Sequence, residues 1–439
     1  ALREQAARLA GFVTDRPDLE PAAVGSALVH ARTAFDHRAV VVGTDRDELL
    51  RAVQDLADAD ALAEGSTASG RTVFVFPGQG SQWIGMAAGL YADSPVFRAR
   101  LEECARALEP FVEWDLLEVL LTEEGAGLLE RVDVVQPALW AVMVSLAGLW
   151  QSFGVVPDAV VGHSQGEIAA AVVAGALSLE DGALVVALRS RAIVVLAGLG
   201  GMVSVALGAD RVRGYLERWS GEVAVAAVNG PSSTVVSGSS TALDELVAVL
   251  EVEGVRCRRV PVDYASHSPH VEAIEEELAR LLAPVTPRVP VVPLYSTVTG
   301  EIVDGAGLDG GYWYRNLRGT VEFENAIRSL LADGFTAFVE CSAHPVLTIG
   351  LQETFEAADA SPAVTAIPSL RRDEGGMERF LNSLGQAWTH GLDIDWGRVL
   401  PEAGRLTVLP TYAFQRSRYW LESVGPVGGD VSAAGLVAA

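Results

Sequence analysis

A serine held between two glycines is the feature of this sequence best placed to do chemistry. The segment Gly162-His163-Ser164-Gln165-Gly166 follows an apolar run at residues 159–161 and precedes a helix-forming stretch at residues 167–174. A strand, a Gly-x-Ser-x-Gly turn and a helix form the context that a nucleophile elbow requires. The glycines lack a Cβ, so the chain can turn sharply with the Ser164 hydroxyl at its tip, at the electropositive helix N-terminus. The pattern predicts that Ser164 is a nucleophile, although chance is the alternative in a chain with 44 glycines.

A serine nucleophile needs a base, and the chain has only seven histidines: His30, His37, His163, His267, His270, His344 and His390. His163 is the neighbour of the serine, where adjacent side chains point apart, and three others lie in peripheral segments. His267 follows a predicted strand and precedes a predicted helix, and a loop at the end of an element is where a positioned base is found. His267, His270 and His344 are therefore the candidates. Spacing alone gives His267 even odds of being the base, and a purely structural role for it is equally open.

Two further places could bind a substrate. Pro77-Gly78-Gln79-Gly80 follows an apolar run and could direct backbone N–H groups at an acyl oxygen, or could simply form a strand-to-helix turn. Arg189 lies in an otherwise apolar helical segment, where a guanidinium without an anion would be costly. A substrate carboxylate bound in a bidentate manner would satisfy it, and a salt bridge to a neighbouring acid is the alternative.

Composition excludes several classes of function. The formal net charge of −25 argues against nucleic acid as a partner. Lysine is absent, which excludes a P-loop lysine, a Schiff-base lysine and a Ser-Lys dyad. The three scattered cysteines, Cys104, Cys257 and Cys341, predict neither a disulfide framework nor a zinc site and fit a reduced, cytoplasmic setting. We expect no membrane-spanning helix and no signal peptide, and the helical pattern at the first residue suggests a piece of a longer polypeptide.

The elements expected around these residues form an α/β protein of several parts. Helical and apolar segments alternate over residues 71–200 and again over 264–365, as in βαβ units around a parallel sheet. Residues 201–263 follow the order βαββαβ, which predicts an inserted, ferredoxin-like small subdomain.

The two ends of the chain are expected to flank this core. Within residues 1–70, helices and a strand at 38–43 predict an α+β linker domain. Residues 366–421 leave the core through a helix near 377–391 and a strand at 405–409. Residues 422–439 read as a flexible tail.

Taken together, these segments resemble the acyltransferase domain of modular type I polyketide synthases over nearly the whole chain. Residues 76–82 are similar to the family's N-terminal strand and loop, residues 162–167 to its nucleophile segment, and residues 264–267 to its catalytic-histidine segment. Arg189 falls where the family places the arginine that binds the carboxylate of the extender unit. The resemblance implies an α/β-hydrolase-like large subdomain with a parallel sheet.

The resemblance also implies roles for individual residues. Ser164 would take the acyl group from coenzyme A, and His267 would serve as general base and acid in a Ser-His dyad without an acidic third member. The backbone amides of Gln79 and Gln165 would form the oxyanion hole. The side chains expected to line the pocket are those of Gln136, Asn229, Tyr264 and Ser266. No tightly bound cofactor is expected.

Three segments match the family's pattern for methylmalonyl units: residues 131–136, Gln165, and Tyr264-Ala265-Ser266-His267. Malonyl-specific members would carry an aliphatic residue at 165 and His-Ala-Phe-His at 264–267. The expected partners are methylmalonyl-coenzyme A, the phosphopantetheine arm of an acyl carrier protein, and a ketosynthase domain of the same polypeptide. Residues 1–70 resemble the linker that follows that ketosynthase, and residues 410–421 resemble the linker that returns to it.

Other functions remain open at this stage. The extender unit could be malonyl, or the specificity could be relaxed. A serine thioesterase of the α/β-hydrolase class would need an Asp or Glu to orient its histidine, and neither Asp244 nor Asp263 lies in an evident loop for it. A non-catalytic scaffold domain would form no acyl-enzyme.

Overall fold

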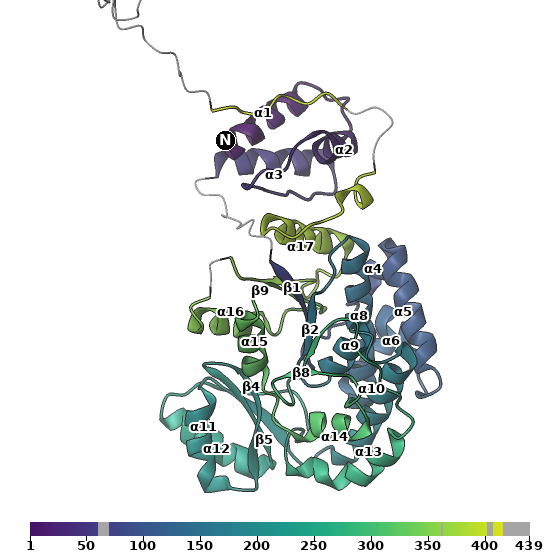
Figure 1. Cartoon of the computed structure of the whole chain (residues 1–439), viewed down its shortest axis with the longest axis vertical. Helices are drawn as coiled ribbons and strands as arrows, with labels where there is room; N and C mark the ends of the chain where they lie inside the picture. The colour runs from purple at the N-terminus through teal and green to yellow at the C-terminus, as the bar shows by residue number, and fades with distance from the viewer. Residues whose placement is uncertain (60–69, 361–362, 402–406, 416–439) are drawn as a thin grey trace, which may run out of the picture.

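A six-stranded sheet forms the centre of the larger part of the molecule in the computed structural model, which describes residues 1–59, 70–360, 363–401 and 407–415 (Figure 1). The strand order is β10-β9-β1-β2-β7-β8, and every neighbouring pair is parallel except β7 and β8. The strands are β1 (Arg71–Phe76), β2 (Ala159–Gly162), β7 (Leu294–Tyr295), β8 (Ile302–Val303), β9 (Phe335–Glu340) and β10 (Thr365–Pro368). The parallel-rich sheet predicted for this part is confirmed.

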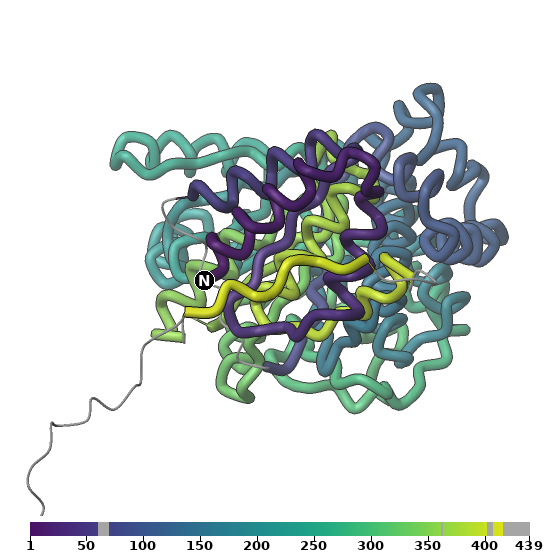
Figure 2. The backbone as a smooth tube through the Cα atoms, turned by 90° about the horizontal axis from the view of Figure 1, so that it is seen from above, coloured from purple at the N-terminus to yellow at the C-terminus, as the bar shows by residue number. Residues whose placement is uncertain are grey.

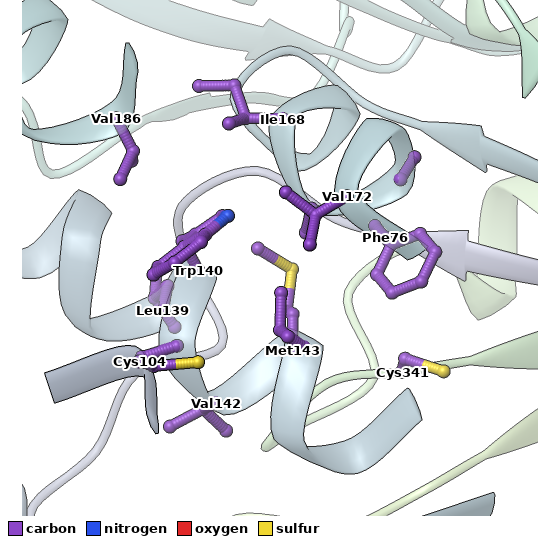
Figure 3. Close-up of a cluster of buried hydrophobic side chains, with 14 of the residues drawn as sticks. Phe76, Cys104, Leu139, Trp140, Val142, Met143, Ile168, Val172, Val186 and Cys341 are labelled. Carbon is purple, nitrogen blue, oxygen red and sulfur yellow. The ribbon is translucent and has the colours of Figure 1, made fainter. Parts of the chain in front are cut away.

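Side chains of β1 alternate between two buried clusters, because successive residues of a strand point to opposite faces of the sheet. Phe74 and Phe76 pack into one cluster, whereas Val73 and Val75 pack into the other. The first cluster, part of which is drawn in Figure 3, lies between the sheet and several helices. These helices are α4 (Ala88–Asp93), α5 (Pro95–Leu108), α6 (Leu116–Leu121), α8 (Val132–Ser152), α9 (Gly166–Val173) and α10 (Leu179–Ile193).

The opposite face is covered by α15 (Phe323–Ala332) and α16 (Thr348–Ala357). The remaining helices of this part are the short α7 (Glu123–Ala126), α13 (Glu275–Leu281) and α14 (Gly310–Arg318). The single helix predicted to follow His267 is instead a 3-10 turn at Pro269–Ile274 followed by α13.

Helix α8 is long enough and apolar enough to cross a membrane, which the sequence reading did not anticipate. However, 83% of its most apolar window is buried inside the protein. Trp140 and Met143, which lie on this helix, are fully buried among side chains of α9, α10 and β1 (Figure 3). The apolar character of α8 is therefore that of a core helix.

A second sheet is antiparallel, with the strand order β4-β5-β3-β6. Its elements are β3 (Gly201–Val205), α11 (Ala209–Leu216), β4 (Val223–Gly230), β5 (Ser233–Gly238), α12 (Ser240–Val252) and β6 (Cys257–Arg259). The unit is joined to the larger part by backbone hydrogen bonds from Val321 N to Ala226 O (2.9 Å) and from Val228 N to Val321 O (2.9 Å).

The N-terminal residues form α1 (Leu2–Thr14), α2 (Pro21–Ala31) and α3 (Arg46–Asp58). The strand expected at residues 38–43 is wrong, because that segment pairs with no described strand. It instead packs against α17 (Met377–Thr389): Arg38 Nη1 donates to the Trp388 carbonyl (3.2 Å) and its guanidinium lies 4.9 Å from the Trp388 ring. The described residues 1–59 are thus helical, and not the α+β unit that was predicted.

The C-terminal segment 407–415 runs beside these N-terminal helices (Figure 2). Leu409 packs on Val24 and Ala27, and the Arg32 side chain donates to the Leu409 carbonyl (3.0 Å). The strand predicted at 405–409 is absent at 407–409, and its first two residues lie outside the described part, as does the predicted tail.

The buried α8 gives a stability prediction. Met143→Ala removes a fully buried side chain from the cluster and leaves a cavity, so the free energy of unfolding should fall by about 2–5 kcal/mol. Denaturant unfolding of the two proteins measures the difference. Ile349→Ala on α16, where 72% of the side chain is exposed, is the control and should change stability by less than about 0.5 kcal/mol. Equal losses would contradict the placement of Met143.

Candidate active site

The serine elbow is built as the glycine pattern predicted. Strand β2 ends at Gly162, α9 begins at Gly166, and Ser164 between them has φ of 55°. A Cβ at Gly162 would lie 2.2 Å from the Glu167 Cα, and one at Gly166 would lie 2.1 Å from the Phe76 carbonyl oxygen. Only glycine fits at these two positions, and the left-handed backbone at Ser164 is the kind of strain that a packed site can hold.

His267 is the histidine that lies at the serine. Its Nε2 is 2.8 Å from Ser164 Oγ, and its Nδ1 is 2.8 Å from the Gly319 carbonyl oxygen. A carbonyl can only accept, so Nδ1 carries the proton and Nε2 is free to accept from the serine hydroxyl. The place that an acid would take in a Ser-His-acid triad is therefore filled by a backbone carbonyl.

The environment of His267 keeps its ring neutral. The side chain is 4% exposed, and burial lowers its pKa to about 3, with the charges of Arg189 and His163 acting in the same direction. The hydrogen bond to Gly319 acts against this shift. An imidazole with a lowered pKa is unprotonated at neutral pH and can accept a proton from Ser164.

The other candidate histidines make different contacts. His163 Nε2 lies 2.7 Å from Asn229 Oδ1, and its ring packs edge-on against Phe323. His344 accepts a hydrogen bond from the backbone N–H of Arg372 (3.1 Å). Neither of them is hydrogen-bonded to Ser164, and the same is true of His270.

Arg189 is buried in α10 with 1% of its surface exposed. Its Nη1 donates to Gln136 Oε1 (3.3 Å), its Nη2 donates to Asn316 Oδ1 (3.1 Å), and its Nε has no partner within the described residues. No carboxylate of the described chain lies within 4.0 Å of its guanidinium, so the salt-bridge alternative is not found there. Burial lowers the pKa of Arg189 to about 10, and the group is still cationic at neutral pH.

Polar side chains of the predicted pocket form one network with Arg189. Gln136 Nε2 donates to Gln79 Oε1 (3.1 Å), and the Tyr264 hydroxyl donates to the same oxygen. Burial raises the pKa of Tyr264 to about 12, so the phenol stays neutral. The structure thus brings together Arg189, Gln136, Gln79 and Tyr264, which lie far apart in the sequence.

Three other predicted residues are placed differently. Ser266 is 7% exposed and its hydroxyl contacts Met202 Sδ (3.4 Å). Gln165 is 1% exposed, and neither atom of its side-chain amide has a partner among the described residues. Asn229 does not join the Arg189 network, because its side chain binds His163. The backbone N–H groups of Gln79 and Gln165 donate to no acceptor in the described part of the chain and are free for a ligand.

Three residues of the site were missed by sequence reasoning: Glu167, Asn316 and Gly319. Asn316 Nδ2 donates to the Ser164 carbonyl (3.2 Å) and to Glu167 Oε2 (2.8 Å), while its Oδ1 accepts from Arg189. Glu167 is fully buried, and burial raises its pKa to about 7. A carboxylate at the start of an apolar helix was a readable signal of a buried partner. The sequence around Asn316 and Gly319 gave no indication that these two residues belong to the site.

Fold and site together define an α/β protein with an elbow serine, a histidine held by a carbonyl, and a buried arginine that is held by two amides and by no carboxylate of the described residues. The family profile described as "Acyl transferase domain" matches residues 73–394. The chain belongs to this family, and it is an acyltransferase domain of the kind found in modular type I polyketide synthases.

Individual relatives agree with this assignment. Polyketide synthase GfsE of Streptomyces halstedii is 58% identical over 99% of this chain, which spans only 12% of that relative's length. The acyltransferase domain from module 8 of the salinomycin polyketide synthase is 59% identical, with a TM-score of 0.86 over 90% of this chain and 94% of that one. The acyl transferase domain of SpnD, solved in complex with 2-(pent-4-yn-1-yl)malonyl, is 31% identical, with a TM-score of 0.78 over 89% and 93%.

The lowered pKa of His267 gives a test by NMR. Burial disfavours the imidazolium, so the ring signals of His267 should not titrate between pH 8 and 5. Selective labelling of histidine rings, with His267→Gln to assign the signal, provides the measurement. A midpoint near the ordinary value of about 6.5 would show that the ring is solvated and that the buried geometry is wrong.

Proposed function

We propose that this domain transfers a methylmalonyl unit from coenzyme A, through an ester on Ser164, to the phosphopantetheine thiol of an acyl carrier protein. The observation that carries the proposal is the hydrogen bond of 2.8 Å between Ser164 Oγ and His267 Nε2, together with the buried Arg189 guanidinium, which has no carboxylate partner in the described part of the chain. The histidine activates Ser164 as a nucleophile. The buried guanidinium of Arg189 fits an acyl group that ends in a free carboxylate.

In the first half of the reaction, His267 Nε2 takes the proton of Ser164 as Oγ attacks the thioester carbonyl. The oxygen of the tetrahedral intermediate would accept from the amides of Gln79 and Gln165, which donate to no acceptor among the described residues. The C–S bond then breaks, and the His267 proton passes to the leaving thiolate of coenzyme A.

The second half runs the same steps with a different thiol. His267 takes the proton of the phosphopantetheine thiol, and the sulfur attacks the Ser164 ester. Collapse of the intermediate breaks the bond to Oγ and returns the proton to Ser164. The Gly319 carbonyl holds the imidazole in the tautomer that both halves need.

Arg189 orients the substrate through its carboxylate. The guanidinium is fixed by Gln136 and Asn316, and both of these amides leave its charge in place. A planar guanidinium can bind a carboxylate through two parallel hydrogen bonds, and burial strengthens that pair. A hydrolase or a thioesterase for simple acyl chains would have no use for such a group.

The methyl branch is assigned from the resemblance of Gln165, residues 131–136 and residues 264–267 to methylmalonyl-type members. Tyr264 and Ser266 are both buried in the loop that carries His267, so they are able to limit the space beside the reacting carbon. One methyl group in an apolar pocket is worth about 1–3 kcal/mol, so discrimination against malonyl should be about 10–200-fold.

The partners follow from the same proposal. The domain would act within a longer polypeptide, in the cytoplasm, beside a ketosynthase and with an acyl carrier protein as acceptor. The N-terminal helices, with α17 and residues 407–415 packed against them, would then be the linkers toward the ketosynthase.

Intact mass after brief incubation with coenzyme A esters tests the proposal directly. The wild-type protein should gain one methylmalonyl group on Ser164 and should prefer it to malonyl in competition. Ser164→Ala removes the only atom that can hold the ester, and His267→Ala removes the base, so each should slow transfer on the order of 10⁴-fold or more. His270→Ala is the matched control.

Several results of this experiment would contradict parts of the proposal. An acyl adduct on Ser164→Ala would remove the assignment of the nucleophile. Preferential loading of malonyl would refute the extender specificity alone. Rapid thioester hydrolysis without an adduct would point to a hydrolase, and no reaction at all would point to a scaffold.

Arg189 can be tested by comparing two acyl donors. Removing its guanidinium leaves the methylmalonyl carboxylate desolvated and unpaired, a loss of about 2–5 kcal/mol, whereas propionyl-coenzyme A has no such group. Acylation of Arg189→Ala should therefore fall far more with methylmalonyl-coenzyme A than with propionyl-coenzyme A. Arg191→Ala, two residues along α10 and exposed, should change neither rate. Equal losses for both donors would show that Arg189 only supports the fold.

A further inference from the structure

A buried amide lies between two buried ionisable side chains near the serine, Arg189 and Glu167. Asn316 is 2% exposed and lies on α14 between Arg189 on α10 and Glu167 on α9. Its Oδ1 accepts from Arg189 Nη2 (3.1 Å), and its Nδ2 donates to Glu167 Oε2 (2.8 Å). Arg189 and Glu167 therefore contact opposite ends of the same side chain, and they form no ion pair with each other within the described residues.

The orientation of this amide is fixed by the hydrogen-bonding groups at its two ends. Glu167 also accepts hydrogen bonds from the hydroxyls of Tyr312 and Thr297. The Ser164 carbonyl can only accept and the Arg189 guanidinium can only donate, so the NH₂ end of Asn316 faces Ser164 and Glu167 and its oxygen faces Arg189. The same NH₂ group reaches the Ser164 carbonyl (3.2 Å), which ties the amide to the backbone of the nucleophile.

This arrangement leaves the positive charge of Arg189 able to attract a further anion. A buried arginine normally pairs with a buried acid, and the paired guanidinium then has little attraction left for a third group. Here the amide supplies a hydrogen bond to Arg189 without a negative charge, and it occupies the position from which Glu167 would reach the guanidinium. Arg189 Nε is left without any partner among the described residues.

We propose that Asn316 is a positioning residue for substrate selection: it keeps Arg189 apart from Glu167, so that the arginine stays available to the carboxylate of the acyl group. This rests on the proposed function, in which Arg189 binds that carboxylate. Glu167 serves to hold the amide in the one orientation that suits Arg189, and Asn316 links the carboxylate-binding group to the serine backbone.

The test measures acylation of Ser164 by methylmalonyl-coenzyme A and by propionyl-coenzyme A, and takes the ratio of the two values of kcat/KM. Asn316→Asp places a carboxylate directly against Arg189, where it competes with the carboxylate of the substrate. The ratio should fall on the order of 10²-fold, mainly through KM for the methylmalonyl donor, while propionyl transfer changes much less. Asn325→Asp is the matched control, because Asn325 is exposed and also donates its Nδ2 to a glutamate, Glu322 (2.8 Å).

A second pair of variants separates charge from structure. Asn316→Ala removes the spacer and opens Arg189 to Glu167, so the ratio should again fall. Adding Glu167→Gln to Asn316→Ala removes the competing carboxylate, and the ratio should recover toward the wild-type value even if both rates stay low. A merely structural role predicts the opposite, since the double variant would lose a further hydrogen-bonding group and gain nothing.

The outcomes distinguish this inference from the function on which it rests. If the wild-type protein accepts propionyl from coenzyme A but no acyl group that bears a free carboxylate, both the proposed function and the role of Asn316 are overturned. Wild-type protein that prefers the methylmalonyl donor, with Asn316→Asp keeping that preference while both rates fall, would overturn the role of Asn316 alone. If Asn316→Asp does not fold by circular dichroism, the Asn316→Ala pair decides: no recovery of the ratio in the double variant overturns the proposal.

Discussion

The burial of the Arg189 guanidinium, with no acid paired to it among the residues that the structure describes, is the constraint on which the site depends. Removing a charge from water costs several kcal/mol even after a protein relaxes around it. Arg189 is held by two amide oxygens, from Gln136 and Asn316, which solvate the charge and leave it uncompensated. Gln136 on α8 is in turn bound to Gln79 in the loop after β1, so both of these elements are connected to this one cation.

The histidine depends on a different kind of support, which comes from backbone between the two sheets. The His267 Nδ1 binds the Gly319 carbonyl. The two residues after Gly319 are bound to β4, because Thr320 Oγ1 donates to the Val225 carbonyl (2.8 Å) and the Val321 N–H donates to the Ala226 carbonyl. The smaller unit therefore contributes to the position of the imidazole without placing a side chain on it.

The parts of this arrangement that could be predicted from sequence are those with a local cause. The elbow at Ser164 needs glycine on both sides for steric reasons, and an arginine in an apolar helix signals a buried charge, so both are readable from a few residues. Asn316 and Gly319 act only because α14 and the following loop pack behind α9, and nothing in their own neighbourhood shows it. The error at residues 38–43 has the same origin, since an apolar extended segment becomes a strand only if another strand pairs with it.

The arginine and the histidine are also linked to each other through charge. Burial is the main cause of the lowered pKa of His267, and the positive charge of Arg189 lowers it further. A carboxylate bound to Arg189 would cancel that second effect, because the imidazolium that forms when Ser164 loses its proton would no longer face an unpaired cation. An acyl donor with a carboxylate would therefore be bound more tightly and would also meet a more basic histidine, whereas a simple acyl group would gain neither advantage.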